Sequence, residues 1–222
     1  MLRPLRSLIV LAVAAVAIVA CRTAAPVPAP DTQPAPARPA VVQPGAPGQV
    51  STTSAAAAPV TIAHVKADVE FMQGMIGHHA QALEMVDLLQ TRTESSDMKL
   101  LALRIKVSQQ DEIKAMQEWL RDRGETAPGE HAHHAHGFTP MPGMLTAENM
   151  ARLRATKGRE FDRLFLEYMI KHHEGALVMV DQLYKTDGAG QEAMINAFAS
   201  DVVADQQMEI DRMIAMWRGL QK

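Results

Sequence analysis

Two pairs of adjacent histidines occupy the same place in a segment that occurs twice in the chain. The segment reads DVEFMQGMIGHHAQALEMVD at residues 68–87 and DRLFLEYMIKHHEGALVMVD at residues 162–181. The histidines are His78, His79, His172 and His173, and the methionines that precede them are Met75 and Met169. Imidazole and thioether groups together favour copper, and Cu(I) in particular, as a bound metal. A pattern repeated in both halves of one chain therefore predicts paired metal sites and a repeated architecture.

A second repeated pattern places a glutamate and a methionine four residues apart. It reads Q-x-x-E-I-x-x-M in both copies and contributes Glu112, Met116, Glu209 and Met213. Residues three or four apart lie on one face of a helix. The methionine before each histidine pair is three residues from the first histidine and four from the second, so it can approach either of them. A buried glutamate needs a partner, which either a metal or a histidine supplies. All these residues are therefore candidate ligands, although a His–Glu layer also forms without a metal and methionine commonly fills a core.

A histidine-rich tract in the connection between the repeats is a third candidate site. Its histidines are His131, His133, His134 and His136. This composition is typical of accessible metal-capturing tracts, and a solvated polar loop has the same composition. The M-P-G-M sequence follows this tract. Its methionines, Met141 and Met144, either belong to the same metal-capturing site or form a hydrophobic contact that leads into the next helix.

The elements that position these residues are predicted to be helices. The repeated segments have the hydrophobic periodicity of amphipathic helices, with the histidines on the apolar side. The second pattern lies on another such helix, whose expected N-cap is Ser95 or Ser96 and whose expected end is Gly124. Each half of the chain is therefore predicted to be a helical hairpin.

Two hairpins predict an all-α fold, a four-helix bundle over residues 61–222. Its expected parts are hairpin one at 61–124, the His-rich connection at 125–145 and hairpin two at 146–220. The third helix is expected to run from near Thr146 to Lys185 with a bend around Gly158. No strand of useful length is expected.

The N-terminal part of the chain resembles an export signal followed by a tether. Residues 1–21 contain a basic start and an apolar run that ends at Cys21, as in a bacterial lipoprotein signal in which the cysteine is lipidated. An ordinary signal anchor or a conventionally cleaved signal is the alternative. Residues 22–60 hold nine of the 13 prolines, which favours a disordered, extended tether.

The composition excludes several classes of protein. The formal net charge is −3 and no basic block lies outside the signal, so nucleic-acid binding has no support. The single cysteine, Cys21, excludes an intrachain disulfide. No Ser/His/Asp or Cys/His arrangement and no phosphate-binding glycine loop is present in the sequence.

The combined motifs resemble the domain-of-unknown-function 305 family over about residues 64–220. The motifs are F-M-x-x-M-I-x-H-H at Phe71–His79, F-L-x-x-M-I-x-H-H at Phe165–His173, M-P-G-M at Met141–Met144, and Q-x-x-E-I-x-x-M at Gln109–Met116 and Gln206–Met213. The resemblance implies a ferritin-like four-helix bundle that is usually exported, and some members of the family are associated with copper binding.

The two copies differ at a few positions. Leu166 stands where the first copy has Met72, so the two sites are expected to be similar without being identical. Gly74 and Gly77 correspond to Tyr168 and Lys171 in the second copy, so we assign these glycines no chemical role.

We therefore predict a protein of the bacterial cell envelope, facing the periplasm or another extracytoplasmic space, that binds copper for buffering, tolerance or relay. Its expected partners are a metal ion, the membrane through the N-terminal lipid, and a metal-transfer protein or a second copy of the chain. One alternative is a ferritin-like oxidase with a di-iron or di-manganese centre, but that class needs several carboxylates and a Glu-x-x-His motif at the site. The other alternative is a structural or partner-binding bundle without metal.

Overall fold

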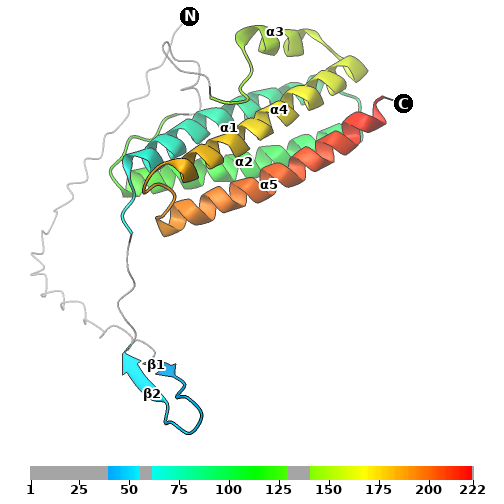
Figure 1. Ribbon diagram of the computed structural model, residues 1–222. Coiled ribbons are helices and arrows are strands. Elements are labelled where there is room, and N and C mark those ends of the chain that lie inside the picture. Colours follow the sequence, from blue (N-terminus) through cyan, green and yellow to red (C-terminus); the bar gives the residue numbers. More distant parts are fainter. Residues whose placement is uncertain (1–39, 56–61, 130–140, 222) are drawn as a thin grey trace, which may run out of the picture. The chain divides into compact units, whose positions relative to one another are not determined.

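The computed structural model describes residues 40–55, 62–129 and 141–221, and helices dominate these ranges (Figure 1). The helices are α1 (Lys66–Arg92), α2 (Ser96–Asp122), α3 (Ala147–Ala155), α4 (Gly158–Lys185) and α5 (Ala193–Gly219). α1 packs against α2 and α4 packs against α5, and the two hairpins meet along α1 and α4. The predicted all-α fold with a four-helix bundle is confirmed, and the short α3 lies beside α1 and α4.

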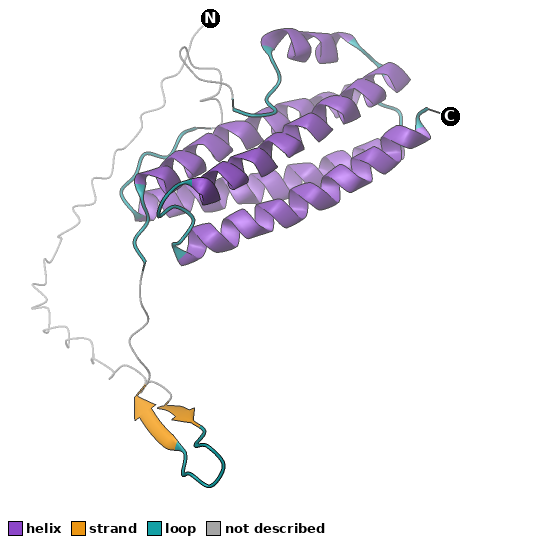
Figure 2. Cartoon of the chain, in the orientation of Figure 1, coloured by secondary structure: helices purple, strands orange, loops and turns teal. Residues whose placement is uncertain are grey.

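A short β-hairpin lies in the Pro- and Ala-rich part of the chain, where no strand was expected. Its strands, β1 (Ala40–Gln43) and β2 (Thr52–Ala55), pair in the antiparallel direction (Figure 2). Both strands contain β-branched residues, which favour extended pairing. The N–H of Gln49 donates to the carbonyl of Ala46 at 2.8 Å and closes the turn between them. The expectation of no strand was therefore wrong for this segment.

The ends of α2 agree with the predicted signals. Ser95 is the N-cap, and its hydroxyl accepts a hydrogen bond from the N–H of Met98 at 3.3 Å. After the last turn Gly124 adopts a φ of 72°, a conformation that favours glycine. The N–H of Glu125 then donates back to the carbonyl of Leu120 at 2.9 Å, which satisfies a carbonyl at the end of the helix.

The prediction of one bent helix between Thr146 and the end of α4 was wrong. The chain is extended at Thr156, where φ is −90° and ψ is 160°, so α3 ends there and α4 begins at Gly158. Gly158 has a φ of 60°, which favours a break at this position. The break lets α3 place Met150 and Leu153 against the bundle, where both are buried.

The interior of the bundle contains two apolar clusters. On each of the four long helices, polar side chains lie between the residues of one cluster and the residues of the other. The first cluster includes Met85, Met169 and Met213, and the second includes Met75, Met116 and Met179. We call the side chains between the clusters the polar layer: His78, His79, Gln109, Glu112, His172, His173, Gln206 and Glu209. No helix within the described ranges combines the length and apolar character needed to cross a bilayer.

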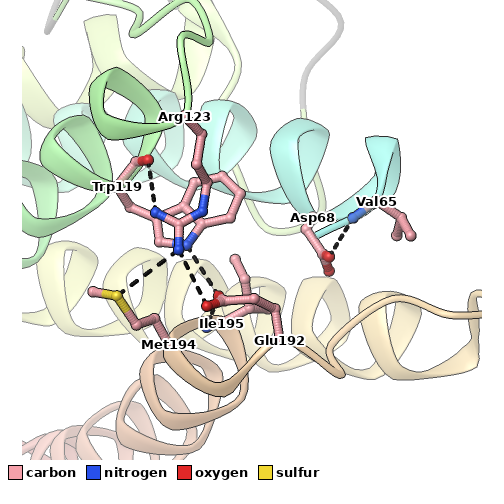
Figure 3. Close-up of polar contacts among 7 residues, drawn as sticks. All are labelled: Val65, Asp68, Trp119, Arg123, Glu192, Met194 and Ile195. Atoms are coloured by element: carbon pink, nitrogen blue, oxygen red, sulfur yellow. Dashed lines mark hydrogen bonds and ion pairs between the residues drawn. The ribbon is translucent and has the colours of Figure 1, made fainter. Parts of the chain in front are cut away.

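A group of polar contacts joins the end of α2 to the start of α5 (Figure 3). Glu192, the N-cap of α5, accepts hydrogen bonds from Trp119 Nε1 and from the N–H of Ile195, both at 3.1 Å. Arg123 donates to the other carboxylate oxygen of Glu192 at 3.1 Å, and its guanidinium lies 4.2 Å from the centre of the Trp119 ring. These contacts connect hairpin one to hairpin two.

Replacing Glu192 with alanine is expected to lower the free energy of unfolding by ~2–4 kcal/mol at neutral pH. The change removes the cap of α5, the partner of Arg123 and the acceptor of the buried indole N–H together. Urea unfolding of the wild type and the variant measures the loss. Glu118→Ala, at an exposed position of α2, is the control. Equal unfolding free energies for Glu192→Ala and Glu118→Ala would contradict the account.

The contribution of Glu192 to stability also depends on pH. Burial alone raises the pKa of Glu192, but hydrogen bonds from Trp119 and the backbone, together with the charge of Arg123, lower the pKa overall. A lowered folded-state pKa means that the contribution is complete above the ordinary pKa of 4.5 and is lost as the pH falls through the folded-state pKa. The difference between wild type and Glu192→Ala should therefore shrink as the pH is lowered below 4.5.

Candidate metal centre

The structure brings the paired histidines of both repeats into one buried layer. His78 and His79 come from α1, and His172 and His173 come from α4. Their side chains are at most 1% exposed, so the prediction that both pairs face the interior is confirmed. Adjacent residues on a helix point about 100° apart, which sends the two members of each pair in different directions.

The first histidine of each pair lies at the contact between α1 and α4. The ring centres of His78 and His172 are 3.8 Å apart, with an angle of 36° between the ring planes. The second histidine of each pair points toward the partner helix of its own hairpin, with ring centres 6.2 Å apart for His78 and His79 and 6.3 Å apart for His172 and His173. The layer therefore has a central imidazole pair and one flanking imidazole on each side.

Each flanking imidazole is hydrogen-bonded to the glutamate that was predicted to face it. His79 Nε2 lies 2.6 Å from Glu112 Oε2, and His173 Nε2 lies 2.7 Å from Glu209 Oε2. An ionised carboxylate only accepts hydrogen bonds, so Nε2 carries the proton in both contacts. Such a carboxylate contact orients a metal-ligating histidine and raises its basicity. Glu112 and Glu209 therefore each fix the orientation of one histidine through Nε2. The Nδ1 atom of each of these histidines points away from the glutamate.

A backbone carbonyl orients one of the central histidines, which sequence reasoning missed. His78 Nε2 donates to the carbonyl of Pro142 at 3.0 Å, and Pro142 belongs to the M-P-G-M sequence in the connection. The segment is fixed by two further hydrogen bonds, in which Gln81 Nε2 donates to the Leu145 carbonyl at 3.0 Å and the Leu145 N–H donates to Gln81 Oε1 at 2.7 Å. The only sequence signal for this role was the M-P-G-M motif itself.

Two glycines allow this segment to lie directly on α4. Gly143 has a φ of 76°, and a Cβ on it would lie 2.4 Å from the carbonyl oxygen of Lys171. A Cβ on Gly175 would lie 2.0 Å from the carbonyl oxygen of Pro142, the same oxygen that accepts from His78. Close packing of backbone on backbone therefore holds the carbonyl against the imidazole.

Gly175→Ala is expected to lower the free energy of unfolding by ~1–3 kcal/mol, because the added methyl group pushes the connection off α4. Thermal or urea unfolding measures the loss. Gly219→Ala is the control, since a Cβ on Gly219 would meet no atom within 4 Å. A Gly175→Ala protein as stable as the control would show that this packing does not hold the segment.

Several nitrogens of the layer are buried and have no hydrogen-bond partner. They are His78 Nδ1, His79 Nδ1, His172 Nδ1, His172 Nε2 and His173 Nδ1. Buried polar atoms are normally paired, so a group of unpaired imidazole nitrogens requires an explanation. The Oε1 atoms of Gln109 and Gln206 in the same layer are also unpaired. An imidazole nitrogen without a proton or a partner is the atom that binds a metal.

The central histidines are held in the neutral state that metal binding needs. Burial, together with the electrostatic effect of the neighbouring His79, lowers the pKa of His78 to about 3, although the Pro142 carbonyl acts in the opposite direction. Burial and the neighbouring His78 lower the pKa of His172 well below its ordinary value of 6.5. At neutral pH both rings are therefore uncharged, and because Nε2 of His78 carries the proton, its Nδ1 has a free lone pair.

The four methionines predicted as ligands are buried where the apolar clusters meet the layer. Met75 and Met116 lie in the second cluster, and Met169 and Met213 lie in the first. All four are fully buried. Among the described residues, no three His, Cys, Asp or Glu side chains converge on one point.

The two glutamates differ in their access to solvent. Glu112 is 14% exposed and lines a pocket of about 460 Å³ that also contains Asp111, Asp201 and Asp205. Burial and the charges of Glu112 and Glu209 raise the pKa of Asp205. Glu209 is 3% exposed, and Arg104 Nε lies 3.8 Å from its Oε1. The acidic surroundings of Glu112 attract cations, whereas Arg104 opposes their approach to Glu209.

Two predicted sites lie outside the described residues. They are the tract of His131, His133, His134 and His136, and the lipidated cysteine, Cys21.

The bundle is similar to solved structures. A protein from Streptomyces coelicolor, described as a secreted DUF305 protein, is 25% identical with a TM-score of 0.61; the match covers 70% of this chain and 94% of that one. A DUF305 fragment from Deinococcus radiodurans is 28% identical with a TM-score of 0.59, covering 69% and 97%. CopM in its Cu(II)-bound form is 26% identical with a TM-score of 0.56, covering 68% and 96%.

No curated protein matches the chain closely. The model of the family described as a domain of unknown function, DUF305, matches residues 68–217, which include both repeats, the M-P-G-M segment and the whole polar layer. The chain therefore belongs to the DUF305 family.

Proposed function

We propose that this protein binds copper, as Cu(I) foremost, in the polar layer. The observation that carries the proposal is that all four buried histidines keep an unpaired Nδ1. For three of them, Nε2 is fixed by Glu112, Glu209 or the carbonyl of Pro142. Histidines oriented in this way through one nitrogen leave the other for a metal.

The donor set favours copper over harder metals. Met75, Met116, Met169 and Met213 border the layer and supply thioether sulfur, which suits Cu(I) when combined with imidazole. The similarity to CopM, whose Cu(II)-bound form has the same fold, supports the choice of metal. We assign these methionines and the four histidines as ligands, and Glu112 and Glu209 as the groups that orient His79 and His173.

We further propose that the protein acts at the bacterial cell envelope, where it buffers or relays copper. The apolar run that ends at Cys21 and the Pro-rich segment after it support a lipid anchor with a tether.

The tract at 131–136 would capture metal weakly outside the core site. Deleting residues 131–136 is then expected to lower weak Cu(II) binding while the far-UV spectrum of the bundle is unchanged.

Two other functions make different predictions. A di-iron or di-manganese oxidase would need several carboxylates at the site, and the polar layer contains two, each hydrogen-bonded to its own histidine. Iron or manganese that co-purifies with the protein, with a redox-active optical band, would favour it. A bundle without metal explains the His–Glu contacts but leaves the Nδ1 atoms without partners.

A Cu(I) competition titration tests the proposal. The wild type is expected to hold Cu(I) against a chromophoric chelator, and His78→Ala combined with His172→Ala should lower the bound stoichiometry. His78→Gln combined with His172→Gln is a second variant that preserves more volume, and circular dichroism verifies that each variant is folded. An unchanged stoichiometry in a folded variant would refute the core site.

A further inference from the structure

The first turns of α1 contain a hollow that the second repeat lacks. Gly74 lies within α1, and its counterpart in α4 is Tyr168. A Cβ on Gly74 would lie 3.0 Å from Met141 Sδ and 3.6 Å from Met179 Cε. Two methionine side chains, one from the connection and one from α4, therefore meet over the backbone of this glycine.

This hollow is part of an open pocket between α1 and α4. The pocket has a volume of about 280 Å³, and Met141 and Met179 line it together with Gly74 and Pro142. Met141 is half-buried, whereas the four methionines beside the polar layer are fully buried. The thioether of Met141 is therefore within reach of a solute that enters the pocket.

The second repeat is closed at the equivalent position. Tyr168 replaces the glycine, is 7% exposed, and donates its hydroxyl hydrogen to Asn149 Oδ1 of α3 at 3.3 Å. The repeat partner of Met179 is Met85, which is fully buried in the first apolar cluster. A glycine inside a helix is destabilising relative to alanine, so the hollow is not explained by helix formation.

We propose that Met141 and Met179 form a separate binding site for a soft monovalent cation, Cu(I) or Ag(I), at the mouth of this pocket. Thioethers select soft cations over Zn²⁺, Mg²⁺ or Ca²⁺. Gly74 is the residue that makes room for the Met141 sulfur. The site does not depend on copper binding in the polar layer. One of its ligands, Met141, is the residue before Pro142, whose carbonyl orients His78. It thus provides a point of first contact for metal outside the buried histidines.

Ag(I) titration of the full chain, labelled with ¹³C at the methionine methyl groups, tests this site by NMR. The methyl resonances of Met141 and Met179 are expected to shift together at the first additions of Ag(I). Met179→Leu should abolish the shift at Met141, while Met85→Leu, the same change at the repeat-equivalent buried position, should leave it unchanged. Met-to-Leu changes preserve volume, so both variants should fold.

Gly74→Ala separates a binding role from a packing role. The added methyl group displaces the Met141 sulfur and should weaken Ag(I) binding at this site roughly tenfold or more. The thermal midpoint should not fall, because alanine is the better helix former. Unchanged Ag(I) binding in both Gly74→Ala and Met179→Leu would overturn the proposal. Histidine ¹⁵N resonances, in protein that is also labelled with ¹⁵N-histidine, report the polar layer separately, so failure of one site is distinguishable from failure of the other.

Discussion

Lowering the pH from 6.5 to about 4.5 is expected to remove about 2 kcal/mol from the free energy of unfolding of the metal-free protein through His78, and His172 is expected to add to this loss. The cause is the central histidine pair. Burial lowers the pKa of His78 to about 3 and that of His172 well below 6.5, whereas both titrate near 6.5 in the unfolded chain. His78 therefore costs about 1.4 kcal/mol for every pH unit between 6.5 and its folded-state pKa, and His172 acts in the same direction.

The direction of this effect follows from which state binds more protons. Well above pH 6.5 both rings are neutral in both states and contribute no pH dependence. Below that value the unfolded chain takes up protons that the folded chain excludes. The free energy of unfolding therefore decreases as the pH is lowered, until the folded-state pKa is reached. A loss of this size is a large fraction of the stability of many domains, so the metal-free protein should be clearly less stable in mild acid than at neutral pH.

Urea unfolding of chelator-treated protein between neutral pH and about pH 4.5 measures this slope. His78→Gln combined with His172→Gln should flatten it, because glutamine does not titrate. His64→Gln is the control, since the His64 side chain is 29% exposed and lies outside the polar layer. A wild-type stability that does not change across this range would contradict the burial of two neutral histidines.

Replacing both glutamates of the layer with glutamine is expected to weaken Cu(I) binding about 10–100-fold for each pair without unfolding the protein. The amide oxygen of glutamine still accepts the Nε2 proton of His79 or His173, so the hydrogen bonds and the packing persist. The negative charge that raises the basicity of the imidazole is lost. Metal affinity is therefore expected to change much more than stability.

Competition titrations of Glu112→Gln, Glu209→Gln and the double variant measure this effect. Glu118→Gln, which removes the same charge from an exposed position of α2, is the matched control. Folded variants that bind Cu(I) as tightly as the control would mean that the carboxylates do not support metal ligands. In that case the His–Glu contacts would be structural only.

The sequence was sufficient to predict the helices and the inward faces of the histidines and glutamates, because these depend on local periodicity. The repeat also predicted that each histidine pair faces a glutamate of its own hairpin, and one member of each pair does so: His79 contacts Glu112, and His173 contacts Glu209. The two helices of a hairpin are neighbours, and residue spacing shows which side chains lie on their facing sides. Contacts within one hairpin can therefore be predicted from the sequence.

Contacts between distant segments were not accessible in this way. The partner of His78 is a backbone carbonyl 64 residues away, at Pro142, and no side-chain pattern marks a carbonyl as an acceptor. The break at Thr156 depends on how α3 packs against α1 and α4, which the periodicity of a long helical segment does not reveal. The hollow at Gly74 became interpretable only when Met141 and Met179 were placed beside it.

The central claim is that Nδ1 atoms of the buried histidines hold copper while their Nε2 atoms stay bound to Glu112, Glu209 and the Pro142 carbonyl. Long-range ¹H–¹⁵N spectra of ¹⁵N-histidine-labelled protein, recorded anaerobically with and without Cu(I), test this claim most directly. We predict that Nδ1 resonances of layer histidines move on addition of Cu(I) and that Nε2 of His78, His79 and His173 stays protonated. Histidine resonances that do not move while Cu(I) binds elsewhere on the protein would contradict the account.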